Sequence, residues 1–209
     1  MNFVNYITTI LLSLQPSYSD GENWEQRTER MTVIAQAIDD AASKSTCTDK
    51  YATAPCTKVW SSDKKSLVLL LVTKGYWESR FAKNVHEGKC RKYECDAYTV
   101  NGNILHRARS PWQIQRTSLV TKDEYEKMNS SSLESTTLSA IVATRYLALG
   151  MNKCHTISGA MSIYGGAKTC NWDRVKERMQ FYKILQGKTN DQLDSDVEKQ
   201  KIALSKRNP

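Results

Sequence analysis

The sequence has no internal repeat, no Cys-x-x-Cys pair and no apolar run of the roughly 20 residues that a membrane-spanning helix needs. These absences exclude repeat architectures, paired zinc knuckles and a transmembrane span. Glycine and proline are also scarce, at 9 and 4 of 209 residues, which excludes collagen and other low-complexity chains. The remaining composition lies near the globular average, 40% hydrophobic and 25% charged, and predicts one domain with a sizeable core.

The charge of the chain is unbalanced toward basic residues. There are 30 Lys and Arg residues against 22 Asp and Glu, a formal net charge of +8, which predicts attraction to an anionic partner. Nucleic acid, a membrane surface and an acidic cell-wall polymer all fit this charge. The basic residues are dispersed and show no recognition signature of a nucleic-acid-binding module, so nucleic acid is not predicted as a partner.

Six cysteines form three pairs of sequence neighbours: Cys47 with Cys56, Cys90 with Cys95, and Cys154 with Cys170. Pairing neighbours would close three local loops, and a disulfide across a loop of roughly 15 residues stabilises a fold by about 3 kcal/mol. The spacing therefore predicts disulfides and an oxidising compartment. Two alternatives stay open, which are six reduced thiols and a zinc site around His86 or His155. We expect no metal and no other cofactor.

Residues 1–21 are predicted to form a separate N-terminal segment. The stretch Phe3–Leu14 is apolar over about three helical turns. Its length suits an export signal, but no Lys or Arg precedes it, as such a signal requires. The alternative is a retained segment that packs on its own domain or on an assembly partner.

Residues 22–187 are predicted to form the main domain. Apolar residues recur at helical spacing within Glu22–Ser43, which indicates an amphipathic helix. The stretch Asp63–Ser79 contains the solid apolar block Leu67–Val72, which predicts a helix buried on all sides at the centre of the domain. The turn Asn101-Gly102-Asn103 between two apolar runs predicts a β-hairpin, because Asn and Gly tolerate positive φ.

Further helices are expected along the second half of the chain. The first spans Gln113–Met128, and the second begins at a Ser131/Glu134 capping box and ends at Gly150. The third is Ile157–Tyr164. The fourth lies around Trp172, with Asn171 as its cap and Gly187 as its end. Residues 188–209 are polar and are expected to form a solvated helical tail or an assembly contact. The predicted fold class is mainly α, a helical bundle around the buried helix with a small β-hairpin region.

Glu78 is the candidate catalytic residue. It ends the most apolar predicted helix and has aromatic residues on both sides, surroundings that disfavour the charged form and keep the carboxyl group protonated. Such a carboxylic acid can act as the general acid at a glycosidic oxygen. The structural alternative is a solvated carboxylate or an ion pair with Arg80.

Three ordered motifs carry a resemblance to soluble lytic transglycosylases and goose-type lysozymes. They are Gly75–Phe81 (GYWESRF), Ser110–Gln115 (SPWQIQ) and Ser162–Gly166 (SIYGG), and the resemblance spans roughly Trp24 to Gln186. It implies an α+β lysozyme-like fold with a peptidoglycan cleft between two lobes.

The resemblance also implies roles for single residues. Glu78 matches the catalytic glutamate and Ser79 the serine beside it. Gln113 matches a glutamine that lines the cleft, and Tyr164 matches the tyrosine that steadies the catalytic carboxyl group. Two positions depart from the family, with Ser110 in place of Gly and Gly165 in place of Asn.

Two catalytic branches remain open. A lytic transglycosylase needs one acid, because the sugar's own 6-hydroxyl attacks, whereas an inverting hydrolase needs a second carboxylate to activate water. The candidates for that second carboxylate are Glu87, Glu94 and Asp96. Trp112 and Tyr98 are expected to be exposed and to stack on sugar faces.

The predicted activity is cleavage of the β-1,4 bond between N-acetylmuramic acid and N-acetylglucosamine, by transglycosylation with Glu78. The alternatives are a lysozyme-type hydrolase and an inactive structural component of a virion or envelope assembly. The expected partners are peptidoglycan strands and, through the termini, virion or envelope-assembly proteins. The expected location faces the cell wall: virion-associated, periplasmic or secreted.

Overall fold

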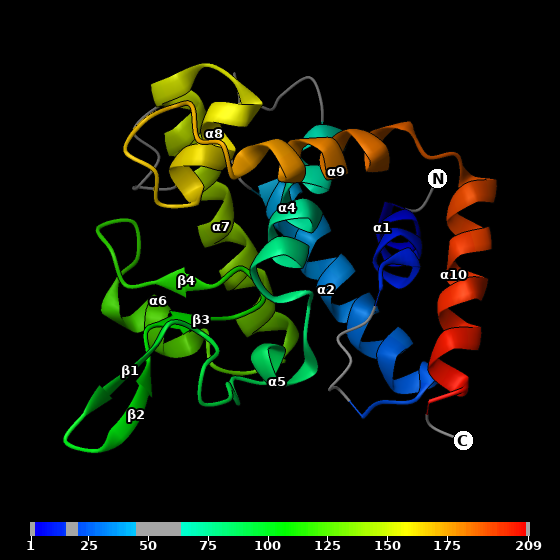
Figure 1. Cartoon of the computed structure of the whole chain (residues 1–209), viewed down its shortest axis with the longest axis horizontal. Helices are drawn as coiled ribbons and strands as arrows, with labels where there is room; N and C mark the ends of the chain where they lie inside the picture. Colours follow the sequence, from blue (N-terminus) through cyan, green and yellow to red (C-terminus); the bar gives the residue numbers. More distant parts are fainter. Residues whose placement is uncertain (1–2, 16–20, 45–63, 208–209) are drawn as a thin grey trace.

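A computed structural model describes residues 3–15, 21–44 and 64–207 (Figure 1). The longer helices are α1 (Phe3–Ser13), α2 (Trp24–Lys44), α4 (Lys64–Ser79), α7 (Leu133–Cys154), α9 (Val175–Gly187) and α10 (Asn190–Ser205). The shorter ones are α5 (Lys83–His86), α6 (Lys122–Lys127) and α8 (Ile157–Tyr164). The mainly α architecture with a small β region is therefore confirmed.

The β region consists of two antiparallel pairs. Strands β1 (Ala97–Val100) and β2 (Asn103–His106) form the predicted hairpin, in which Tyr98 lies opposite Leu105. Strands β3 (Ala108–Arg109) and β4 (Ile114–Gln115) form a second pair. In Figure 1 the strands and α6 lie on one side of α4, and α1 and α10 lie on the other.

Helix α4 forms the centre of the core, as its sequence predicts. Every residue from Leu67 to Gly75 is buried, and the helix contacts α2, α7 and α9. A helix without an exposed face is stable only when other elements cover it on all sides. Its last turn, which contains Glu78, is thereby held in a fixed position relative to three other helices.

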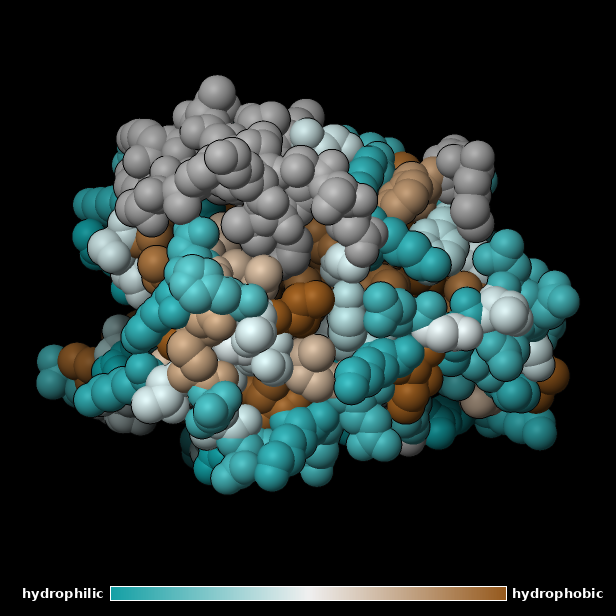
Figure 2. All heavy atoms as spheres, turned by 90° about the horizontal axis from the view of Figure 1, so that it is seen from above, coloured by the Kyte–Doolittle hydropathy of each residue, from teal (hydrophilic) through white to brown (hydrophobic). Residues whose placement is uncertain are grey.

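The two terminal helices pack on each other and on α2. Ile7, Ile10 and Leu11 of α1 have no exposed surface, and α10 buries Leu193 and Leu204. Residues 190–205 thus form the predicted helix, and it buries Leu193 and Leu204, whereas the sequence suggested a solvated helical tail or an assembly contact. Seen from above, hydrophilic side chains cover most of the described surface, and hydrophobic patches show between them (Figure 2). Among the described residues, no helix combines the length and the apolar character needed to cross a membrane.

Two of the three predicted disulfides are confirmed, Cys90–Cys95 and Cys154–Cys170. Cys47 and Cys56 lie outside the described residues, as does the loop predicted between them. The two bonds indicate an oxidising compartment and leave no thiolate among these four cysteines for a zinc ion. His86, which the zinc alternative also used, instead lies 2.8 Å from the Thr136 hydroxyl through Nε2.

The helix predicted over Gln113–Met128 is wrong for its first half. Gln113 has φ +52°, and the next two residues form strand β4. The helix begins only after Thr121, whose hydroxyl accepts from the Glu124 amide while the Glu124 side chain accepts from the Thr121 amide. This reciprocal cap starts a helix of one and a half turns, and the apolar residues before it are used by tertiary packing.

Two helix boundaries also differ from the prediction. Ser132, one residue after Ser131, caps α7 by accepting from the Ser135 amide. Helix α9 begins at Val175, and its N-cap Arg174 makes no capping hydrogen bond, so Asn171 has no capping role there.

Gly150 does not end α7, which continues to Cys154 and stops where His155 adopts φ +56°. A Cβ atom at position 150 would lie 2.6 Å from Cα of Ala160 in α8. Real Cβ atoms do not approach backbone atoms so closely, so this glycine allows α7 and α8 to touch.

Replacement of Gly150 by Ala should destabilise the fold by about 1–3 kcal/mol, because the added methyl group forces α8 away from α7. Gly187→Ala is the matched control, since nothing lies within 4 Å of a Cβ built there. Its effect should stay within about 0.5 kcal/mol. Urea unfolding of both variants measures the difference, and equal midpoints would contradict the close α7–α8 contact.

Candidate active site

Glu78 lies in a cleft with a volume of about 380 Å³. Gln113 and Tyr164 line the same cleft, so the structure brings together the central residues of the three sequence motifs from α4, the segment before β4, and α8. The other lining residues are Asp96, Ala108, Ile114, Gln115, Thr117, Tyr146, Ile163, Gly165, Gly166 and Arg178. Among the described residues, no group of three or more His, Cys, Asp or Glu side chains is placed to hold a metal ion.

Two cations contact the Glu78 carboxyl group. Lys74 Nζ lies 2.5 Å and Arg178 Nη1 3.0 Å from the same oxygen, Oε1. The prediction from aromatic neighbours did not include these two ion pairs, and the structural alternative of a pair with Arg80 is wrong in its partner. Tyr76 and Trp77 instead pack on Phe181 of α9, with ring centroids 5.0 and 6.5 Å away.

Sequence analysis missed both cations, for different reasons. Lys74 precedes Glu78 by four residues on one helix, a spacing that brings side chains together and that could have been noticed. Arg178 follows 100 residues later on α9. Only the packing of α9 on α4 brings it to the cleft.

Lys74 is a fully buried lysine, with 0% of its side chain exposed. Its pKa is lowered to about 8, chiefly by burial; the charge of Glu78 opposes this shift and the charge of Arg178 adds to it. Its ammonium lies 4.0 Å from the centroid of the Tyr164 ring. A charged lysine and its neutral amine are therefore both accessible near neutral pH.

Tyr164 contacts Lys74 and the Trp112 backbone. Its hydroxyl donates to the carbonyl of Trp112 at 3.0 Å, and its ring contacts Lys74. Burial raises the pKa of Tyr164 well above its usual value, so the hydroxyl stays protonated. Tyr164 thus links the Trp112 segment to α8.

Ser79 joins the end of α4 to the second motif. Its Oγ lies 2.8 Å from the Pro111 carbonyl and accepts from the Phe81 amide at 3.1 Å. Gln113 is fixed nearby, where its side-chain amide donates to the Ser110 carbonyl at 3.2 Å. Ser110 has φ +67°, a backbone conformation that favours glycine.

The expectation that Trp112 is exposed is wrong. The side chain has 0% exposed surface, and its indole donates to the Leu71 carbonyl of α4 at 2.9 Å. The turn before β4 lies against α4, so this ring belongs to the core and not to a sugar platform. Tyr98 is half-buried and lies in a neighbouring hollow, 4.2 Å from the Arg107 guanidinium.

Of the three candidates for a second carboxylate, Asp96 alone lines the Glu78 cleft. Its Oδ2 accepts a hydrogen bond from the side-chain amide of Gln115 at 3.1 Å. Glu87 pairs with Lys89 at 3.1 Å, and Glu94 accepts from the Arg91 backbone amide at 2.7 Å. Glu87 and Glu94 therefore lie outside the cleft and serve local contacts in their loop.

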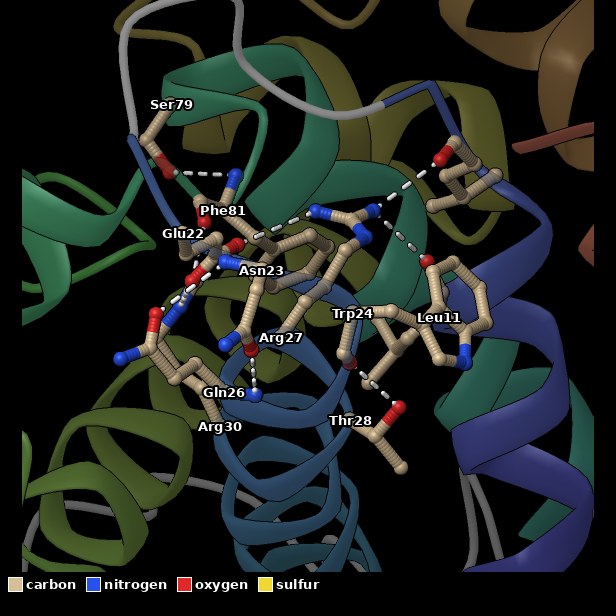
Figure 3. A network of polar contacts seen from close by, with 11 residues as sticks. Leu11, Glu22, Asn23, Trp24, Gln26, Arg27, Thr28, Arg30, Ser79 and Phe81 are labelled. Carbon is tan, nitrogen blue, oxygen red and sulfur yellow. Dashed lines mark hydrogen bonds and ion pairs between the residues drawn. The ribbon is translucent and has the colours of Figure 1, made fainter. Parts of the chain in front are cut away.

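A buried ionic network fixes the turn that follows Glu78 (Figure 3). Arg30 of α2 donates to the carbonyl of Phe81 and pairs with Glu22 at 2.6 Å. Arg27, one turn earlier, lies 3.6 Å from Glu22 and donates to the carbonyl of Leu14 at 3.1 Å. The network thus connects the end of α1, the start of α2 and the end of α4.

No family model, curated protein or solved structure matches the chain. Its function is therefore inferred from the chemistry of the cleft and from the resemblance of the three motifs.

Glu22→Gln should destabilise the protein by about 3 kcal/mol or more, because it removes a buried carboxylate charge that pairs with two buried guanidinium groups. Glu198→Gln is the control, since its 4.0 Å pair with Lys201 is exposed and contributes little. Chemical denaturation compares the two variants. A loss at Glu22 no larger than that at Glu198 would contradict the network.

Proposed function

We propose that the protein cleaves peptidoglycan strands between N-acetylmuramic acid and N-acetylglucosamine, as a lytic transglycosylase with Glu78 as acid and base. One observation carries the proposal: Glu78, Gln113 and Tyr164 come from separate motifs and line a single cleft. The cleft provides a carboxyl group, amide donors and a half-open shape, which suit a polysaccharide better than a small apolar ligand. The location faces the cell wall, in line with the two disulfides.

The reaction needs one carboxyl group. Glu78 gives a proton to the glycosidic oxygen as the bond to C1 breaks, and then takes the proton of the 6-hydroxyl as this oxygen bonds to C1. The product carries an anhydro ring and no water is consumed. Both cations bind Oε1, and no described residue makes a hydrogen bond to Oε2, so Oε2 is the oxygen available to substrate.

Lys74 is the proton source for Glu78 in this proposal. Its pKa is lowered to about 8, so its neutral amine is accessible near neutral pH. Lys74 Nζ contacts Glu78 Oε1 and can therefore pass its proton to the carboxyl group. Arg178 remains charged and holds the carboxyl group in place in both states.

Glu78→Gln should lower the rate of wall cleavage by at least tenfold, because the amide keeps the shape and has no transferable proton; general acid catalysis contributes ~10² to 10⁴-fold. Zymography on purified peptidoglycan measures the loss, and thermal unfolding checks that the fold is intact. A folded variant that keeps more than a tenth of the wild-type rate would refute the role of Glu78.

Asp96→Asn separates the two catalytic branches. In a transglycosylase this variant should keep most of its activity, as should Glu87→Gln and Glu94→Gln, whose carboxylates lie outside the cleft. Mass analysis of the products should show anhydro ends. Loss of orders of magnitude at Asp96 alone, with reducing ends from the wild type, would show that Asp96 activates water and that the enzyme is a hydrolase.

The pH dependence of cleavage tests the role of Lys74. Lys74 loses its proton as pH rises through about 8, its pKa, and its ion pair with Glu78 is then lost, so kcat/KM should fall there. Lys74→Met lacks the titrating amine, so the fall near pH 8 should be absent from its profile. Lys65→Met, at the exposed first turn of α4, is the control and should keep the fall. The same alkaline limb in wild type and Lys74→Met would exclude Lys74 as the titrating group.

A further inference from the structure

A second hollow adjoins the Glu78 cleft. It has a volume of about 590 Å³ and shares Ala108 and Gln115 with the cleft as lining residues. Its walls come from the β1–β2 hairpin, β3 and α6, with Tyr98, Leu105 and Tyr125 among them. A polymer bound across Glu78 would extend from one hollow into the other.

The described lining of this hollow carries positive charge and no carboxylate. Its positively charged side chains are Arg107, Arg109 and Arg116. Arg109 is compensated, because Glu126 lies 3.2 Å away. Within the described part of the chain, Arg107 and Arg116 form no ion pair. We name this feature the arginine hollow.

Arg107 is held in position by an aromatic ring. Arg107 directly follows β2, and its guanidinium lies 4.2 Å from the centroid of the Tyr98 ring in β1. Stacking of this kind fixes the plane of the guanidinium and leaves its N–H groups for another partner. The planar fork of N–H groups matches the two oxygens of a carboxylate.

A buried hydroxyl group adds an independent observation. Ser110 lines the arginine hollow and is 6% exposed, and its Oγ has no hydrogen-bond partner within the described chain. A buried hydroxyl without a partner costs about 1–3 kcal/mol. A ligand oxygen in the hollow would satisfy this group.

We propose that the arginine hollow is a carboxylate-binding subsite for the acidic groups of the glycan strand, with Arg107 and Arg116 as the charged contacts and Ser110 as a hydrogen-bond donor. This proposal rests on the proposed function. It deepens the proposed function by predicting that the enzyme distinguishes peptidoglycan from neutral N-acetylglucosamine polymers, because peptidoglycan bears carboxylates on its stem peptides, or on its lactyl groups where the peptide is absent.

Calorimetric binding to the non-cleaving Glu78→Gln protein tests the subsite. The probes are a hexasaccharide of alternating N-acetylglucosamine and peptide-bearing N-acetylmuramic acid, and an N-acetylglucosamine hexamer without charge. The double variant Arg107→Gln/Arg116→Gln should raise the Kd for the charged probe by about three- to thirtyfold and leave the neutral probe unchanged. Ser110→Ala should raise the Kd for the charged probe by a few-fold and leave the Kd for the neutral probe unchanged.

Lys183→Gln/Lys206→Gln is the matched control, because it removes the same charge from exposed positions on α9 and beyond α10. If the two double variants raise the Kd for the charged probe equally, net charge and not the hollow is responsible, and the subsite is refuted. The subsite is also refuted if the arginine variant raises the Kd for the charged and the neutral probe equally.

Failure of the subsite and failure of the proposed function give different results. If the wild type cleaves peptidoglycan and the arginine variant binds like the control, the subsite alone is wrong. If the wild type neither cleaves peptidoglycan nor binds either hexasaccharide, both proposals are wrong. If the arginine variant loses binding to single-stranded DNA but binds the charged hexasaccharide as the wild type does, the hollow binds a different polyanion and the carboxylate subsite is refuted.

Discussion

The contact between Arg30 and the Phe81 carbonyl links the helical core to the turn behind the candidate active site. Arg30 is buried, so its charge needs the Glu22 carboxylate beside it, and the same carboxylate pairs with Arg27. Arg27 in turn holds the carbonyl at the end of α1. The position of the N-terminal helix and the position of Glu78 therefore depend on one ionic group.

A second constraint is the cost of charge inside the cleft. Lys74 is fully buried, and it is tolerable there because Glu78 and the face of Tyr164 surround its ammonium. The same packing that buries Lys74 also makes its proton easier to lose. The burial of Lys74 and the lowering of its pKa thus have one physical origin, the low polarity around α4.

The segment between β3 and β4 serves the core and the site at once. Trp112 fills space beneath α4, while its neighbours Ser110 and Gln113 turn toward the arginine hollow and the Glu78 cleft. Two residues with positive φ on either side of the tryptophan make this division possible. The two hollows meet at this segment, so a strand bound in both would be aligned by a rigid part of the fold.

The amino-acid sequence was enough to predict the buried helix from its apolar block, the hairpin from Asn101-Gly102 and two disulfides from neighbouring cysteines. These depend on residues close in the chain, whose preferences are local. Tertiary structure alone decided that Trp112 is buried, that Asp96 and not Glu87 or Glu94 reaches the cleft, and that Arg178 contacts Glu78. These facts depend on how separate elements pack, since burial and charge pairing are set by neighbours that are distant in sequence.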